Sequence, residues 1–329
     1  MRALTKLGPA AIDLVDRPAR ALDAGLVRLE VTATGVCGTD LHLAADEYPC
    51  EPPVTMGHEI TGIVTEVGSG VSPTWIGRQV ACETYFSACE TCRECRDGRR
   101  NLCRSRRSLG SFEDGGFAPE VVLPALNLHV LPPGLEPVLG VLCEPLACLC
   151  NCLLDPSRIA AGDRVLVIGP GALGLLAVQL AAAQGARVTC AGLPADRRRL
   201  DVSADLGAQV TTDPPDEETF DVVVECSGAA GGIAAALRAA RRRARIVQVG
   251  IRGSDLEVPW DLILYKELEV SSGFGSTPAS WRRAMDLVAA GSVRLDGLVS
   301  DLVPLTEWRR AFALVGSPET IKVALDPQH

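Results

Sequence analysis

Two short segments near the start of the chain carry side chains that could bind a metal ion and move a proton. Residues 35–42 read Gly-Val-Cys-Gly-Thr-Asp-Leu-His and offer a thiolate, a hydroxyl, a carboxylate and an imidazole. Sixteen residues after His42 comes His58, followed directly by Glu59. Zn²⁺ binds such side chains, and a catalytic zinc keeps one position open beside its protein ligands. On these residues alone, a buried cysteine beside a surface histidine is an equally good interpretation.

Four further cysteines form the most specific pattern in the sequence. They follow the spacing C-x₂-C-x₂-C-x₇-C, at Cys89, Cys92, Cys95 and Cys103. Four thiolates can close around one Zn²⁺ as a tetrahedron, and such a closed shell is structural rather than catalytic. Disulfides and free thiols are the alternatives, but a chain that opens without a secretion signal favours reduced, metal-binding cysteines. The spacing therefore predicts a structural zinc site.

Length and composition limit the class of protein. The chain has 329 residues, of which 47% are hydrophobic, so we expect two packed domains. Its net charge of −9 argues against nucleic acid or an anionic membrane as a partner. The longest apolar run, 138–154, contains Glu144 and Pro145, which a membrane span would rarely tolerate. We therefore expect a soluble, cytoplasmic protein.

A glycine-rich segment in the second half indicates a dinucleotide site. Residues 164–168 read as a buried strand, and Gly-Pro-Gly-Ala-Leu-Gly at 169–174 leads directly into an apolar helix. A second strand follows at 187–191, which completes the βαβ context that the dinucleotide fingerprint requires. Alternating strands and helices continue to about residue 271 and predict a parallel sheet. The residues expected to contact the cofactor are Gly169, Gly171, Ala172, Leu173, Gly174, Gly192, Arg197 and Gly250.

The sequence leaves the choice between NAD and NADP open. The acidic residue that would bind the ribose 2′-hydroxyl, about 20 residues beyond the glycines, is missing. The second strand instead ends at Gly192 and Leu193, and Arg197 begins a run of three arginines. These arginines could accept a 2′-phosphate or simply face water, so they favour NADP only slightly.

The segments 35–40, 57–59, 89–103 and 169–174 together resemble the zinc-dependent medium-chain dehydrogenase/reductase family of alcohol and polyol dehydrogenases, which includes sorbitol and threonine dehydrogenases. The resemblance covers essentially the whole chain and implies an α/β fold of two domains. Residues 1–146 and 272–329 would form a GroES-like, mainly β catalytic domain. Residues 147–271 would form a doubly wound Rossmann domain that binds NAD(P). It further implies a catalytic and a structural zinc, a homodimer or homotetramer, and a small alcohol or ketone as substrate.

The resemblance also assigns roles to individual residues. The catalytic zinc would be held by Cys37, His58, Glu59 and Glu144. The proton path to solvent would run from the hydroxyl of Thr39 through the cofactor ribose to His42. Asp40 would orient a histidine ligand.

Glu144 and the segment 273–274 bear on the substrate. Sorbitol-type enzymes have glutamate at the position of Glu144, where simple alcohol dehydrogenases have cysteine. Gly273 and Phe274 stand where sorbitol dehydrogenases tend to have the Arg-Tyr pair that binds polyol hydroxyls. The expected substrate is therefore a secondary alcohol of the polyol, sugar or amino alcohol class, without a more specific assignment.

We therefore expect a zinc-dependent oxidoreductase that transfers hydride between such an alcohol, or its ketone, and NAD(P). The alternative is a non-catalytic nucleotide-binding or redox-sensing protein of the same fold. A sensor would be expected to have lost Cys37, His58 or Thr39, and all three are present.

Overall fold

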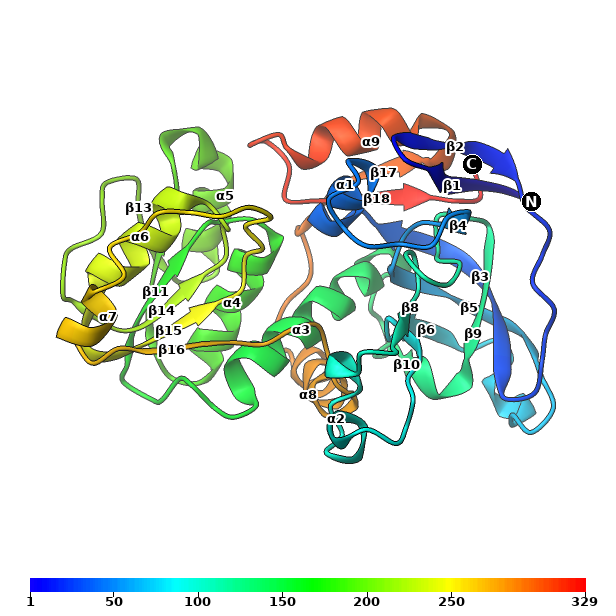
Figure 1. Cartoon of the computed structure of the whole chain (residues 1–329), viewed down its shortest axis with the longest axis horizontal. Helices are drawn as coiled ribbons and strands as arrows, with labels where there is room; N and C mark the ends of the chain where they lie inside the picture. Colours follow the sequence, from blue (N-terminus) through cyan, green and yellow to red (C-terminus); the bar gives the residue numbers. More distant parts are fainter. The chain divides into compact units, whose positions relative to one another are not determined.

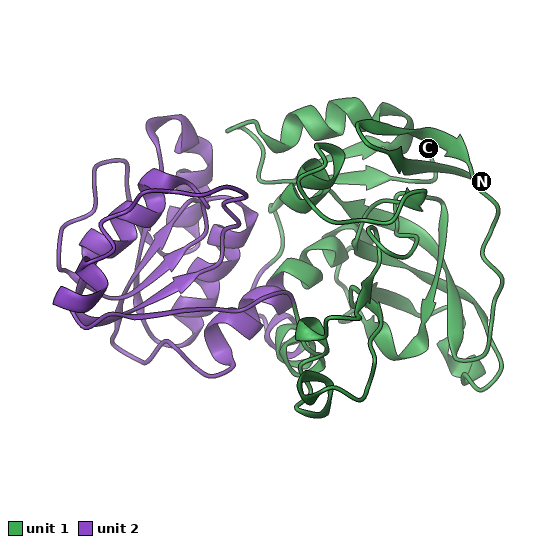
Figure 2. Cartoon of the chain, viewed as in Figure 1, with its two compact units in different colours: residues 1–145, 276–285, 295–329 green, residues 146–275, 286–294 purple.

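The structure, a computed structural model, describes all residues 1–329 and divides the chain into two compact units. Unit 1 comprises residues 1–145, 276–285 and 295–329, and unit 2 comprises residues 146–275 and 286–294 (Figure 2). The predicted boundaries, after residue 146 and before residue 272, divide the chain into a catalytic domain and a cofactor-binding domain. Compactness alone does not test that functional division, which stays a prediction.

Unit 1 is mainly β and is built on a seven-stranded sheet (Figure 1). Six of its strands lie in the order β10 (Leu128–Val130), β6 (Gln79–Cys82), β5 (Glu59–Val67), β3 (Leu26–Gly35), β18 (Lys322–Asp326) and β17 (Val299–Pro304), and β9 (Glu120–Pro124) also pairs with β3. A three-stranded sheet has the order β2 (Ala11–Asp16), β1 (Arg2–Gly8) and β4 (Val54–Thr55). The strands β7 (Tyr85–Ser87) and β8 (Arg107–Ser108) form a separate pair.

Short helices complete unit 1 and lead out of it. They are α1 (Gly38–Ala44), α2 (Arg93–Arg96) and α9 (Trp308–Val315), and both α3 (Cys143–Leu154) and α8 (Pro278–Ala289) cross a boundary between the units. The core packed around α9 contains residues from both ends of the chain, such as Leu4, Trp308 and Leu325. The antiparallel pairing of β18 with β3 joins the C-terminus to the N-terminal sheet.

Unit 2 confirms the predicted parallel sheet. Its strand order is β13 (Gln209–Thr211), β12 (Arg187–Ala191), β11 (Arg164–Ile168), β14 (Phe220–Glu225), β15 (Ala240–Gln248) and β16 (Glu269–Ser272), and every neighbouring pair is parallel. The helices between the strands are α4 (Ala172–Ala183), α5 (Arg197–Asp205), α6 (Ala230–Ala239) and α7 (Leu262–Tyr265). Starting from the central strand β11, the chain builds the sheet outward in both directions, as a doubly wound fold does.

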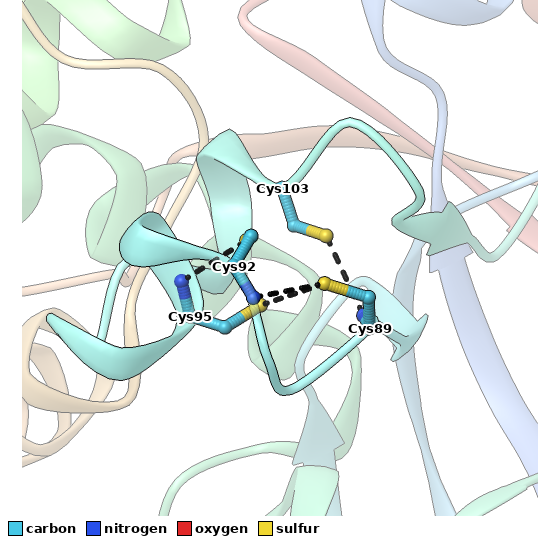
Figure 3. A group of neighbouring side chains, drawn as sticks. All are labelled: Cys89, Cys92, Cys95 and Cys103. Atoms are coloured by element: carbon cyan, nitrogen blue, oxygen red, sulfur yellow. Dashed lines mark hydrogen bonds between the residues drawn. The ribbon is translucent and has the colours of Figure 1, made fainter.

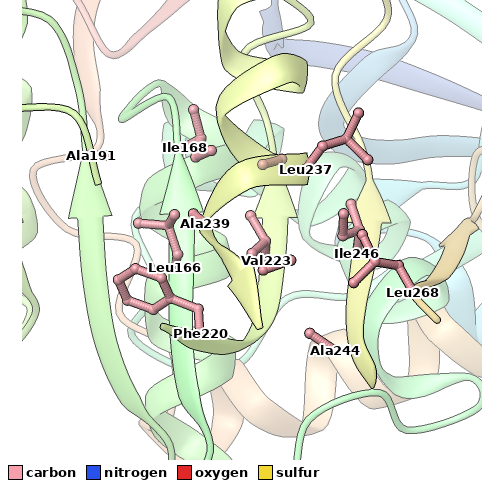
Figure 4. Close-up of a cluster of buried hydrophobic side chains, with 12 residues drawn as sticks. Leu166, Ile168, Ala191, Phe220, Val223, Leu237, Ala239, Ala244, Ile246 and Leu268 are labelled. Carbon is pink, nitrogen blue, oxygen red and sulfur yellow. The ribbon is translucent and has the colours of Figure 1, made fainter. Parts of the chain in front are cut away.

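Buried apolar side chains explain why β11, β14 and β15 lie inside the sheet rather than at its edges. Leu166 of β11, Val223 of β14 and Ile246 of β15 lie side by side in one buried cluster, with Leu237 of α6 covering them (Figure 4). Parallel strands covered by helices on both faces have no solvated side, which explains the unbroken apolar runs at 165–168 in β11 and 222–224 in β14. The helical segment 137–154 is also a long apolar run. It is long and apolar enough to cross a membrane, but 83% of it is buried inside the fold.

A tight turn before β5 directs the side chains of His58 and Glu59. Gly57 has φ +89°, a left-handed conformation that glycine adopts without strain. A Cβ at Gly57 would run into the ring of Phe117. The segment 115–117 also hydrogen-bonds across this turn, with Gly116 N–H donating to the carbonyl of Gly57 over 2.9 Å. The turn therefore has room for glycine only.

Replacing Gly57 by alanine should destabilise unit 1 by about 2–5 kcal/mol, since the left-handed backbone costs about 1–2 kcal/mol and overpacking against Phe117 about 1–3 kcal/mol. The measurement is guanidinium unfolding followed by fluorescence. Gly77→Ala is the matched control, because Gly77 has φ +80° but nothing within 4 Å of its Cβ position. Equal losses in the two variants would contradict the role of Phe117.

Candidate metal and cofactor sites

The N-terminus of α1 positions Cys37 and Asp40. Cys37 precedes the helix, and its backbone N–H donates to Asp40 Oδ2 over 2.8 Å. In return, the Asp40 N–H donates to the Cys37 carbonyl over 3.0 Å. The carboxylate of Asp40 thus satisfies one of the free N–H groups at the start of the helix. This exchange fixes the turn from which the Cys37 thiol projects.

Strand pairing brings His58 and Glu59 next to Cys37. Gly35, at the end of β3, lies opposite Glu59, at the start of β5. The thiol sulfur of Cys37, an imidazole nitrogen of His58 and a carboxylate oxygen of Glu59 all lie within 4.8 Å of one another. One sulfur, one nitrogen and one oxygen at this spacing are a donor set that fits Zn²⁺. The structure thus brings together three of the four predicted ligands.

Asp40 also faces the imidazole of His58. Asp40 Oδ1 lies 3.6 Å from His58 Nδ1, and Asp40 is only 1% exposed. Burial by itself lowers the pKa of His58, but the negative charges of Asp40 and Cys37 outweigh it and raise that pKa well above its ordinary value. A carboxylate that holds one ring nitrogen fixes which nitrogen of the histidine is left for a metal.

Glu144 lies nearby but outside the group of three. It is buried at the start of α3, and its Oε1 accepts a hydrogen bond of 3.0 Å from the Thr84 hydroxyl. Burial is the main cause that raises the pKa of Glu59, and the charge of Glu144 adds to it. The two carboxylates are therefore neighbours. Direct ligation by Glu144 stays a prediction.

Lys322 is a site residue that no motif in the sequence indicates. This lysine begins β18, is 6% exposed, and forms an ion pair with the carboxylate of Glu59. Burial lowers the pKa of Lys322, but the charge of Glu59 outweighs burial and the net shift is upward. A Cβ on Gly35 would meet both the Glu59 carboxylate and Lys322 Cε, so the pair needs glycine there. The signal in the sequence is a lysine between two apolar neighbours, Ile321 and Val323.

Thr39 and His42 lie one turn apart on α1, so they share a face of that helix. Thr39 Oγ1 is 3.6 Å from Cys37 Sγ, within the range of a weak hydrogen bond to sulfur. His42 Nδ1 lies 2.7 Å from Glu47 Oε2, an interaction that the sequence analysis did not anticipate. Their roles in proton transfer stay a prediction.

The side chains of the four cysteines of segment 89–103, which we call the four-cysteine lobe, converge (Figure 3). Their sulfur atoms lie within 4.8 Å of one another, and none forms a disulfide. Backbone N–H groups point at these sulfurs, for example Cys92 N–H at Cys89 Sγ over 3.3 Å. Hydrogen bonds from Thr91 and Cys92 lower the pKa of Cys89 to about 6, which favours its thiolate. A backbone hydrogen bond from Cys95 lowers the pKa of Cys92, but burial and the neighbouring thiols outweigh it and raise that pKa to about 12. Four thiolates at this spacing fit a structural zinc.

The glycine-rich turn follows β11 and opens α4. Gly169 has φ +94°, and a Cβ on Gly174 would collide with the Gly169 carbonyl. Gly171 is the residue before α4, and Ala172 and Leu173 are its first two residues. This arrangement exposes backbone N–H groups of a helix N-terminus, which is where a pyrophosphate binds in such folds. Contact of these residues with a cofactor stays a prediction.

The neighbouring strand β12 ends without a free carboxylate. Leu193 is 69% exposed at the position after Gly192. Asp196 accepts hydrogen bonds from Leu193 N–H over 3.0 Å and from Arg199 over 3.1 Å. Arg197 is 81% exposed and lies 3.5 Å from Asp201. The carboxylate of Asp196 is thus hydrogen-bonded within the protein, whereas the guanidinium group of Arg197 is exposed to solvent.

Glu225, at the carboxyl end of β14, is a second residue that the sequence analysis missed. It is fully buried and accepts hydrogen bonds from Gly228 N–H over 3.0 Å and from Gln248 Nε2 over 2.8 Å. Gly250 N–H donates to the Glu225 carbonyl over 2.9 Å. Glu225 therefore connects the loop after β14 with the end of β15. Its carboxylate binds Gly228 and Gln248, and its backbone carbonyl accepts from Gly250, a predicted cofactor residue.

Comparison with known proteins relates both units to dehydrogenases. Residues 23–133 match the family model described as alcohol dehydrogenase GroES-like domain, and residues 172–290 match zinc-binding dehydrogenase. The chain is 34% identical to sorbitol dehydrogenase of Halalkalibacterium halodurans over 99% of each sequence. It is 32% identical to D-arabitol-phosphate dehydrogenase of Enterococcus avium over 91% of this chain and 89% of that relative.

Solved structures have the same fold. A zinc-binding dehydrogenase from Sinorhizobium meliloti 1021 bound to NADP has a TM-score of 0.89 and 34% identity over 99% of both chains. Galactitol-1-phosphate dehydrogenase from Escherichia coli has a TM-score of 0.87 and 26% identity, and covers 99% of this chain and 100% of its own.

Metal analysis should find two zinc ions per chain, one for each cluster of ligands. Cys37→Ala should retain one zinc and abolish turnover without unfolding the protein. Cys92→Ala should retain the other zinc and mainly lower stability, because structural zinc contributes to folding free energy. Inductively coupled plasma mass spectrometry and unfolding curves test both variants. A single zinc held by the four-cysteine lobe, or full activity of Cys37→Ala, would contradict the assignment.

Lys322→Met should destabilise the zinc-free protein by about 3–5 kcal/mol, because the carboxylate of Glu59 is then buried without its cation. The free energy of unfolding in guanidinium measures the effect. The double variant Lys322→Met/Glu59→Gln should regain most of the loss, since no unpaired charge remains. A single variant as stable as the unmodified protein would show that the ion pair is unimportant.

Proposed function

Because the chain belongs to the zinc-dependent medium-chain dehydrogenase/reductase family, we propose that it oxidises a secondary, polyfunctional alcohol at Cys37, His58 and Glu59. The observation that carries this proposal is the convergence of these three ligand atoms within 4.8 Å, beside the hydroxyl of Thr39.

The chain is a zinc-dependent oxidoreductase that uses NAD(P) and alcohol substrates, as its family and relatives are. Relatives that span 99% of the chain are named as dehydrogenases. They give no support to a non-catalytic sensor. What remains to be proposed is the role of each residue, the form of the cofactor and the class of alcohol.

Cys37, His58 and Glu59 would hold the catalytic zinc, with Glu144 as a fourth candidate ligand. When bound, zinc makes an alcohol hydroxyl more acidic, and the nicotinamide accepts the hydride that leaves the carbon. The residues of the chain then have to bind, orient and remove a proton. Thr39 accepts the proton of the substrate hydroxyl at Oγ1, and His42 passes a proton to solvent.

Buried charges around the ligands hold them in place. Asp40 fixes the ring of His58, and Lys322 neutralises the carboxylate of Glu59. A thiolate and several carboxylates without a compensating cation would repel one another in this buried position. Lys322 is therefore a positioning residue for Glu59, and the four-cysteine lobe has a structural role.

We expect the cofactor to be NADP rather than NAD. Asp196, the nearest acid beyond β12, is occupied by Leu193 and Arg199, so its carboxylate is not available to ribose hydroxyls. Arg197 is exposed and could form a charge-assisted bond with a 2′-phosphate. The relative from Sinorhizobium meliloti is bound to NADP, whereas one from Escherichia coli CFT073 is complexed with NADH, so this choice rests on Asp196 and Arg197.

Exposed apolar residues favour a homodimer or homotetramer. Trp260, Leu264 and Tyr265 are 65–75% exposed, and they precede β16, which has only one neighbouring strand. An apolar surface at the edge of a sheet is an unfavourable surface for a monomer. We expect a second copy of the chain to cover it.

A screen of polyols, polyol phosphates, sugars and amino alcohols with both cofactors tests the proposal. The phosphates are included because two relatives are named for them. Absorbance of the reduced cofactor should rise with a secondary alcohol of these classes, and more strongly with NADP. Arg197→Ala and Arg198→Ala should weaken NADPH binding about tenfold and leave NADH binding unchanged, because only the 2′-phosphate is affected.

Equal losses of both cofactors in the arginine variants would contradict the phosphate assignment. Activity with simple primary alcohols alone would contradict the proposed substrate class. Cys37→Ala serves as the inactive control throughout the screen.

A further inference from the structure

Glu47 holds His42 at two points. Its carboxylate oxygen Oε2 lies 2.7 Å from His42 Nδ1, and its backbone N–H donates to the His42 carbonyl over 2.8 Å. The side chain of His42 is 30% exposed and that of Glu47 is 55% exposed. The pair therefore lies where the protein meets solvent, at the end of the helix that carries Cys37 and Thr39 at its beginning.

The turn that presents Glu47 is fixed by a buried cation. Lys6 is 0% exposed, and its ammonium group lies 2.5 Å from Asp46 Oδ1 and 3.2 Å from the carbonyl of Ala44. Asp46 adopts a left-handed conformation, with φ +63°, and also accepts the N–H of Ala10 over 2.6 Å. Its hydrogen bond with Lys6 lowers the pKa of Asp46. A buried ammonium needs such partners, so the turn is not free to move away.

The contact with Glu47 decides which nitrogen of His42 carries the proton. A carboxylate is only an acceptor, so Nδ1 has to donate and the neutral ring carries its hydrogen there. The other nitrogen, Nε2, is then left with its lone pair. Without a partner on Nδ1, an imidazole can place its hydrogen on either nitrogen.

We propose that Glu47 is a positioning residue that keeps His42 in the form able to accept a proton at Nε2. This rests on the proposed role of His42 as the proton path to solvent. His42 takes the proton released from the alcohol, becomes an imidazolium paired with the Glu47 carboxylate, and then gives a proton to bulk water. Glu47 remains a carboxylate throughout. The one proton released by the alcohol therefore ends in bulk water, and His42 returns to its neutral form.

The chain contains a control for an ordinary surface pair. His329 Nδ1 lies 2.9 Å from Asp326 Oδ2, at the exposed C-terminus. It repeats the imidazole–carboxylate contact away from the proposed site. Asp326→Asn should therefore alter the ring of His329 and leave turnover unchanged.

Nitrogen NMR of the zinc-loaded, histidine-labelled full chain tests the tautomer. The chain has only four histidines, at positions 42, 58, 129 and 329, so assignment by substitution is practical. We expect His42 to carry hydrogen on Nδ1 in the unmodified protein and to shift toward the Nε2–H form in Glu47→Ala. Asp326→Asn should move the His329 signals only. An unchanged His42 tautomer in Glu47→Ala would overturn the proposal.

Single-turnover kinetics distinguish the positioning of His42 by Glu47 from the role of His42 in proton transfer. Glu47→Ala should slow cofactor reduction about tenfold, a part of the full effect of removing a general base, with unchanged affinity for cofactor and alcohol. Glu47→Gln, which keeps an acceptor oxygen, should recover part of the rate. If His42→Ala slows the reaction and Glu47→Ala does not, the positioning role is wrong. If His42→Ala also has no effect, the proton path itself is wrong, and the proposal fails with it.

Discussion

Buried charge is the constraint on which the arrangement around Cys37 depends. Asp40 and Glu59 are each 1% exposed, and Lys322 is 6% exposed. A buried carboxylate without a partner costs several kcal/mol, so each of these groups has to be matched within the protein. Asp40 is matched by the start of α1 and by His58, and Glu59 is matched by Lys322. The positions of the ligands therefore follow from where their counter-charges lie.

Sheet pairing supplies those counter-charges from distant parts of the chain. The strand β3 lies between β5 and β18, so Gly35 is opposite both Glu59 and Ala324. The absence of a side chain on Gly35 leaves the space in which Lys322 and Glu59 meet. A shift of one residue in the register of either pair would turn Glu59 or Lys322 to the other face of the sheet. The register thus determines whether the ion pair forms.

The features that the sequence predicts are local motifs. The features that it does not predict depend on contacts between segments far apart or on turn geometry. The lobe of Cys89 and the turn at Gly169 are recognisable because all the residues of each motif lie within a short segment. Lys322, Glu47 and Glu225 were missed for different reasons. Lys322 reaches Glu59 only through strand order, and Glu47 depends on a left-handed turn at Asp46. Glu225 is buried at the end of β14, where Gln248 of the neighbouring strand β15 binds its carboxylate. No spacing rule records these relations.

The two proposed metal sites consequently differ in which parts of the chain have to fold before each site forms. The lobe takes its four ligands from residues 89–103, and its sulfurs receive N–H groups of the same segment. A local turn is enough to assemble it. The group of Cys37 needs β3, β5 and the C-terminal strand β18 to be paired before its charges are balanced. Zinc can therefore stabilise the lobe as a local element, whereas at Cys37 it can bind strongly only to a sheet that has already closed.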